Sequence, residues 1–214
     1  PELIHSFELG YSKDWDKLSL YSMLYYRYAN NSIRQFTVLK PNGVALAQPQ
    51  NFGTVITYGI ENIFTAKPFS KYDFNLSVSF FRQNINGSNV SNDVAGNIFS
   101  WYGKLINNFV LWSGSKLQLS GVYNSPIATP QGKRIAIYNA DLGFQQKLGK
   151  GNSRIGLIVT DIFNTQKNGF ITNAEDFSYN RRVKADTRAI LITFAYTFGT
   201  SFKEKLMENN FTND

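Results

Sequence analysis

The stretch TRAILITFAYTFG, which runs from Thr187 to Gly199, decides the fold of this chain. Every second residue is large and mostly apolar, and these residues are Arg188, Ile190, Ile192, Phe194, Tyr196 and Phe198. The residues between them are mostly small or polar. A period of two predicts a strand, and ~10 to 13 residues is long for a globular strand but suits a tilted strand that crosses a bilayer. Lipid on one side and a wet lumen on the other would suit the two faces, although the edge strand of a soluble sandwich fits this stretch equally well.

The composition narrows the classes of protein that the chain can form. It contains no Cys and one His, His5, so we expect no disulfide framework, no metal site, no cofactor and no enzymatic function. Aromatic residues make up 15% of the 214 residues, which suits the aromatic girdles of a membrane barrel. The net charge of +7 does not predict nucleic-acid binding, because no basic run is interleaved with aromatic residues.

The rest of the chain repeats the period of two between connections that are alternately short and long. Strands are expected near residues 3–11, 18–28, 54–66, 74–83, 101–112, 117–124, 135–148, 153–164 and 187–199. Short turns alternate with long loops, which are expected at residues 30–53, 84–100, 125–134 and 165–186. Short periplasmic turns and long extracellular loops are typical of an outer-membrane barrel. The sequence therefore predicts an all-β fold, a partial antiparallel transmembrane β-barrel of about nine strands.

Two of the expected strands carry a polar residue on the apolar face. Asn107 lies among the apolar residues of 101–112, and Asp161 interrupts the apolar set of 153–164. A β-bulge or an early entry into a loop would explain either of them.

Three segments carry a resemblance to a known family. They are GVYNSPIATPQGK from Gly121, YNADLGFQQKLGKGNSRIGLIVTDIFNT from Tyr138, and the closing FAYTFG. Through the signatures Tyr123 to Gly132 and Asp161 to Thr165, the chain resembles the C-terminal barrel of an outer-membrane β-barrel family of Bacteroidota that looks like TonB-dependent receptors. The resemblance implies a transporter of the bacterial outer membrane, with an N-terminal plug and a barrel of about 22 strands. This chain would supply the last strands of that barrel.

The interpretation divides the chain into two parts. Residues 1–199 form the C-terminal portion of the barrel, and residues 200–214 form a polar periplasmic tail. The chain begins at Pro1, and we expect it to be the remainder of a longer precursor. Three functions stay open: the barrel portion of a TonB-dependent uptake transporter, which we favour, a structural or adhesive barrel that does not transport, and a soluble β-sandwich that binds a ligand.

Three groups of residues are candidates for function. The last strand resembles the C-terminal signal that the outer-membrane insertion machinery recognises, through Ile190, Ile192, Phe194, Tyr196 and Phe198. The polar residues that we expect to face the lumen are Asn139, Asp141, Gln145 and Thr193. Basic residues of two outer loops either contact anionic lipopolysaccharide or an anionic substrate, or are ordinary solvated charges, and these are Lys133, Arg134, Arg181, Arg182 and Lys184.

An open sheet would leave two edges unpaired, at Leu3–Tyr11 and at Thr187–Gly199. Each unpaired backbone group in lipid costs several kcal/mol, so we expect another protein segment to pair with at least one edge. The candidates are the remaining strands of the same barrel and the barrel assembly machinery, of which we favour the machinery. The other expected partners are outer-membrane lipid and lipopolysaccharide, and nucleic acid is not expected.

Overall fold

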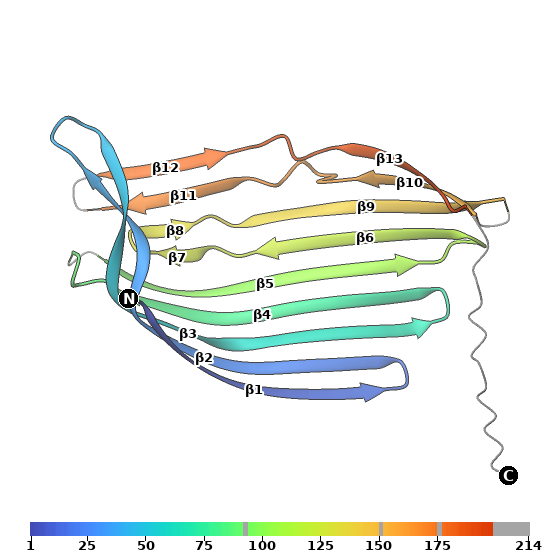
Figure 1. Cartoon of the computed structure of the whole chain (residues 1–214), viewed down its shortest axis with the longest axis horizontal. Helices are drawn as coiled ribbons and strands as arrows, with labels where there is room; N and C mark the ends of the chain where they lie inside the picture. Colours follow the sequence, from blue (N-terminus) through green and yellow to red (C-terminus); the bar gives the residue numbers. More distant parts are fainter. Residues whose placement is uncertain (92–93, 150–151, 175–176, 199–214) are drawn as a thin grey trace, which may run out of the picture.

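The computed structural model describes residues 1–91, 94–149, 152–174 and 177–198. Its main strands are β1 (Leu3–Trp15), β2 (Leu18–Leu39), β3 (Ala45–Phe69), β4 (Tyr72–Asn86), β5 (Ala95–Phe109), β6 (Ser115–Asn124), β9 (Ile137–Leu148), β10 (Ser153–Val159) and β13 (Ile190–Tyr196). They form one nine-stranded sheet in which each strand lies beside its predecessor (Figure 1). The predicted set of nine antiparallel strands is confirmed. The expected tail, residues 200–214, lies outside the described residues. In the described part, no helix is long and apolar enough to cross a membrane.

Short turns and long connections lie at opposite ends of the sheet, and we call these the turn end and the loop end. The turn end is on the right in Figure 1, where only Asp16 and Lys17 separate β1 from β2. The connection between β4 and β5 is at the loop end, and it is shorter than predicted because the strands extend to Asn86 and from Ala95. The predicted placement of turns at one end and longer connections at the other is confirmed, except that the β2–β3 connection (residues 40–44) is as short as the β5–β6 turn (residues 110–114).

Four shorter strands form a second sheet at the loop end. They are β7 (Ile127–Thr129), β8 (Gly132–Arg134), β11 (Asn168–Asn173) and β12 (Ser178–Val183), paired in the order β12-β11-β8-β7. In Figure 1 these strands continue the lines of β6, β9, β10 and β13 beyond a break. The prediction of plain loops at 125–134 and 165–186 is therefore wrong, because each of these segments contains a hairpin.

The prediction of a loop at residues 30–53 is also wrong. β2 and β3 stay paired past the bend at Asn31, from Ser32↔Phe52 to Leu39↔Ala45. Asn31 has a φ of 54°, and beyond it the hairpin crosses the ends of the neighbouring strands (Figure 1). The backbone groups on the facing edges of the two strands satisfy each other's hydrogen bonds, so this hairpin forms without a segregated apolar face.

The strand register separates an apolar face from a polar face. Leu20, Phe64, Leu76 and Leu105 form one cross-strand row, and Ser19, Thr65 and Asn75 form part of the adjacent row on the other face. Large side chains of the apolar face remain exposed, among them Leu9 at 71% and Ile192 at 73%. A soluble sandwich buries such a face against a second sheet. The exposed face is therefore one that lipid would cover.

A small apolar core lies at the loop end. Ala128 of β7 packs there with Ala29, Val55 and Ile85, which come from three strands of the main sheet. These are side chains of the polar face, which becomes apolar near this end. The core fastens the second sheet to the main sheet.

Gln131, in the turn between β7 and β8, connects three parts of the loop end. Its side-chain amide accepts a hydrogen bond from the N–H of Thr37 at 2.8 Å and donates one to the carbonyl of Thr37 at 2.9 Å. Its own carbonyl accepts the N–H of Asn173 at 2.7 Å. Gly132 follows with a φ of 150°, and a side chain there would collide with the carbonyl of Ile171. This turn therefore requires glycine.

Candidate functional site

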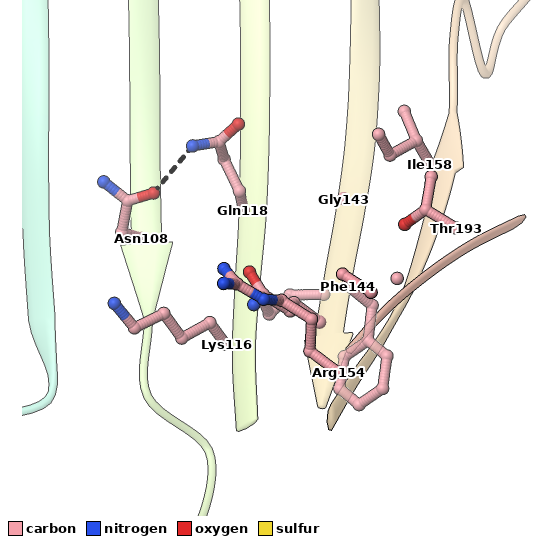
Figure 2. Close-up of a pocket in the computed structure, with 12 residues that line it drawn as sticks. Asn108, Lys116, Gln118, Gly143, Phe144, Arg154, Ile158 and Thr193 are labelled. Atoms are coloured by element: carbon pink, nitrogen blue, oxygen red, sulfur yellow. Dashed lines mark hydrogen bonds between the residues drawn. The ribbon is translucent and has the colours of Figure 1, made fainter. Parts of the chain in front are cut away.

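A polar hollow lies on the polar face near the turn end (Figure 2). Its volume is about 300 Å³, and residues of β5, β6, β9, β10 and β13 line it. Lys116, Gln145 and Gly156 are partners in neighbouring strands, and Gly156 pairs in turn with Thr193. A Cβ on Gly156 would lie 2.5 Å from the Thr193 hydroxyl oxygen, so the glycine makes room for this hydroxyl. The register thus brings together two of the predicted lumen residues, Gln145 and Thr193.

The hollow combines positive charge with amide groups. Gln118 donates a hydrogen bond to the side-chain oxygen of Asn108 at 2.9 Å (Figure 2). Asn108 in turn donates one to the carboxylate of Asp73 at 2.7 Å. Lys116 and Arg154 also line the hollow, and within the described residues neither forms an ion pair. This arrangement suits an anionic group or one rich in hydrogen-bond acceptors.

Four residues of the hollow were not predicted from the sequence, and these are Asn108, Lys116, Gln118 and Arg154. Each of them belongs to the polar alternate set of its own strand, which was the available signal. The alignment of those sets across strands depends on the register, which short turns and pairing determine. The hollow was therefore not predictable as a group of residues.

The other two predicted lumen residues lie on β9 closer to the loop end. Asn139 donates hydrogen bonds to both carboxylate oxygens of Asp141, at 3.2 and 3.3 Å. Asp141 also accepts the backbone N–H of Asp161 at 2.8 Å. In the structure, this pair supports the point where the chain leaves β10 and does not line the polar hollow.

Asp161 is the centre of a group that we call the Asp161 clasp. Its side chain is buried, with 1% exposure, and accepts the backbone N–H groups of Thr165 at 2.8 Å and Gln166 at 3.2 Å. It also accepts the hydroxyl of Thr187 at 2.5 Å and forms an ion pair with Lys184 at 3.0 Å. Burial by itself would raise the pKa of Asp161, but the hydrogen bonds from Thr187, Lys184 and the two N–H groups outweigh it and hold this pKa well below its usual range.

The Asp161 clasp joins the beginning and the end of the long connection from β10 to β13. Next to it, Thr160 donates its N–H to the carbonyl of Ala189 at 2.9 Å, and the N–H of Ala189 donates to the Thr160 hydroxyl at 3.1 Å. The predicted strand 153–164 is too long, because β10 stops at Val159 and Asp161 turns the chain with a φ of 43°. Lys184, one of the predicted basic loop residues, is thus an internal partner.

The other four basic candidates lie on the two faces of the second sheet. Arg134 and Arg181 are both partners of Phe170, one on each side, so the three side chains share one face. Lys133 and Arg182 occupy the alternate positions of their strands and share the opposite face. The sheet therefore presents two separate pairs of positive charges.

The last strand, β13, is an edge of the main sheet. It pairs with β10 on one side, and among the described residues no strand pairs with its other side. The residues of the proposed assembly signal are all exposed, and they are Ile190, Ile192, Phe194, Tyr196 and Phe198. The rings of Tyr196 and Phe198 meet edge to face at 4.5 Å. The strand therefore offers both its backbone and an apolar side to a partner.

Similarity to known proteins identifies the kind of protein that has this architecture. No curated protein matches the chain. It is similar in fold to a solved structure named copper transporter OprC, with 16% identity over 92% of this chain and 32% of that chain and a TM-score of 0.68. It is also similar to the ferric yersiniabactin uptake receptor FyuA from Yersinia pestis, with 12% identity over 92% of this chain and 30% of that chain and a TM-score of 0.66.

The chain thus spans about a third of the length of these two structures, and at such low identity the likeness concerns the fold. A family match covers residues 1–196, almost the whole of the described chain. The apolar face is accordingly the one that meets lipid, and the polar face lines the inside of the barrel. The chain belongs to the outer membrane protein beta-barrel family, as part of a barrel in the bacterial outer membrane.

Proposed function

We propose that the chain is part of the barrel wall of an uptake transporter like the TonB-dependent receptors. The observation that carries this proposal is the continuous polar face, which runs across nine strands behind a lipid-facing apolar face. The names of the two similar structures, a copper transporter and an uptake receptor, support it. The soluble-sandwich alternative does not agree with membership of an outer-membrane family.

In this function the wall binds and guides a solute, and it performs no reaction. Lys116 and Arg154 would attract an anionic or acceptor-rich solute to the polar hollow on the inside of the barrel. We place the loop end outside the cell and the turn end in the periplasm, because outer-membrane barrels have long extracellular and short periplasmic connections. The second sheet and the crossing β2–β3 hairpin would then form part of the extracellular mouth.

The two edges of the sheet would need partners in lipid. In the described residues β1 and β13 are each paired on one side only. We propose that the remaining strands of the same barrel pair with both edges in the finished transporter. We further propose that the barrel assembly machinery holds the β13 edge during insertion, because its apolar and aromatic side chains resemble the C-terminal signal of outer-membrane barrels.

Growth measurements on the full-length protein in its own cells test transport. A deletion strain should fail to grow on at least one scarce nutrient of a panel, and the parent gene should restore growth. The variant Lys116→Glu with Arg154→Glu should not restore it, whereas a control with Lys17→Glu and Lys71→Glu, in exposed turns outside the hollow, should. A deletion strain that grows normally throughout but no longer attaches to surfaces would favour the adhesive barrel instead.

A pulse-chase experiment tests the assembly step separately. A photo-crosslinking residue at Leu191, on the β13 edge of the full-length protein, should give an adduct with the assembly machinery early in the chase. That adduct should then be replaced by one within the barrel. Early samples that contain only the internal adduct would contradict a role for the machinery at this edge.

A further inference from the structure

The apolar face has a hollow of its own near the loop end, with a volume of about 410 Å³. Its floor consists of the small residues Gly103, Gly121 and Ala140, which lie on the adjacent strands β5, β6 and β9. Gly121 is the partner of Ala140, and Gly103 lies two residues from the other partner of Gly121, Leu105. Since lipid covers this face of an outer-membrane barrel, an acyl chain is the group that would enter the hollow.

Aromatic side chains fix the depth of this hollow in the membrane. Trp101, Tyr123 and Tyr138 line its side toward the loop end, and their rings stack at 4.3 Å and 6.0 Å between centroids. Trp and Tyr are enriched where hydrocarbon meets the headgroups. Phe163, from the connection after β10, also lines the hollow and is 71% exposed. The hollow therefore lies just inside the hydrocarbon, on the side where the long connections emerge.

Positive charge lies directly beyond the aromatic side chains. Arg134 precedes Tyr138 by four residues, so the two are at most about 14 Å apart along the chain. Its neighbour Lys133 is the partner of Ala128, which packs on the polar face of the main sheet, so Arg134 lies on the outer side of the second sheet. The Nε atom of Arg134 is buried and has no hydrogen-bond partner within the described residues. Arg181 shares its face, with Phe170 between them. A phosphate oxygen is the acceptor that a guanidinium in this position suits best.

We propose that this part of the outer wall binds one molecule of lipopolysaccharide. One of its acyl chains fills the hollow over Gly121, and its phosphate groups contact Arg134 and Arg181. The position in the outer leaflet and the paired arginines favour this lipid over a phospholipid, because lipopolysaccharide combines several phosphates with several acyl chains. The site is on the outside of the barrel, so it stands whether or not the protein transports a solute.

Native mass spectrometry of the purified full-length protein, titrated with rough-type lipopolysaccharide, tests the site. Gly121→Leu should fill the hollow without strain, because a Cβ there would lie 4.0 Å from its nearest neighbour outside the adjoining residues, the carbonyl oxygen of Asn139. The variant Arg134→Gln with Arg181→Gln removes the charge. The matched controls are Gly143→Leu on the polar face and Lys133→Gln with Arg182→Gln on the opposite face of the second sheet.

We expect each test variant to bind lipopolysaccharide about tenfold more weakly than the parent, and each control to bind as the parent does. Slower migration of unboiled protein on a gel identifies any variant that has not folded, and Gly121→Ser then replaces Gly121→Leu. Equal binding by parent and test variants would overturn the proposal, and so would an equal loss in the controls. Displacement of the bound lipid by equimolar phosphatidylethanolamine would overturn the assignment to lipopolysaccharide.

Discussion

Two neighbouring arginine substitutions in β13 test which face of the wall meets lipid. Ile192 lies midway along the strand, is 73% exposed on the apolar face and pairs with Leu157. An arginine there would bring a guanidinium into hydrocarbon. The expected loss in the free energy of unfolding is about 2–4 kcal/mol if the position is near the bilayer centre.

The next residue supplies the internal comparison. Thr193 pairs with Gly156 and lines the polar hollow together with Lys116 and Arg154. An arginine there would stay in water, and the two nearby positive charges would repel it only through a high dielectric, which costs roughly 0–1 kcal/mol. The two substitutions should therefore differ by about 1–4 kcal/mol.

Equilibrium unfolding by urea, with the full-length protein folded into lipid vesicles, measures this difference. Ile192→Ala serves as a control that removes the side chain without adding charge, and its own loss is subtracted. If Thr193→Arg costs as much as Ile192→Arg, the assignment of the two faces is refuted. A larger cost at Thr193 would reverse the assignment.

Three further predictions concern the loop end. Because the pKa of Asp161 is depressed, its ionised form contributes its full stabilisation above the ordinary carboxyl pKa of about 4, and this stabilisation is lost as the pH falls further. Asp161→Asn should therefore destabilise the protein at pH 7, and unfolding curves should show that the loss in free energy shrinks toward pH 2. A loss that does not depend on pH would contradict the role of the Asp161 clasp. Gly132→Ala should lower the free energy of unfolding by about 1–3 kcal/mol, because its φ of 150° and the nearby Ile171 carbonyl exclude a side chain, and an unchanged urea midpoint would disprove this. Gln131→Ala should speed hydrogen exchange at Thr37, measured by mass spectrometry, and unchanged exchange would mean that other contacts hold the hairpin.

The strands of the main sheet were predictable because lipid and lumen make opposite demands on alternate residues. In β4, for instance, Leu76 and Val78 alternate with Asn75 and Ser77. A single polar residue on the apolar face does not break a strand when a partner satisfies it. Asn107 stays within β5, where its side-chain oxygen accepts a hydrogen bond from the Tyr72 hydroxyl at 2.9 Å.

The strands of the loop end were not predictable from the same signal. Beyond Asn31, pairs such as Gln35↔Pro49 and Phe36↔Gln48 mix polar and apolar residues on both strands. A ribbon that leaves the membrane has no lipid on either side, so nothing sorts its residues by face. Backbone pairing alone then forms the two strands of this ribbon, and their mixed composition resembles that of a loop.

The partners of Asp161 in the clasp were not predictable for a different reason, namely their distance along the chain. In the sequence, Asp161 to Thr165 is visible as a signature, and Asp161 as an interruption of a predicted strand. Its partners Lys184 and Thr187 come 23 and 26 residues later, separated from it by a hairpin. No local pattern connects a carboxylate with residues so far along the chain, so its role was visible only once the fold was known.

The bond between Gln131 and Thr37 has a consequence for how the protein folds. It joins residues 94 positions apart, with β3, β4, β5, β6 and β7 between them. Contacts of such long sequence separation carry a large loop-closure cost unless the intervening strands have already zipped together. A cross-link between Gln131 and Thr37 would therefore form only late in folding, after the strands from β2 to β6 have paired.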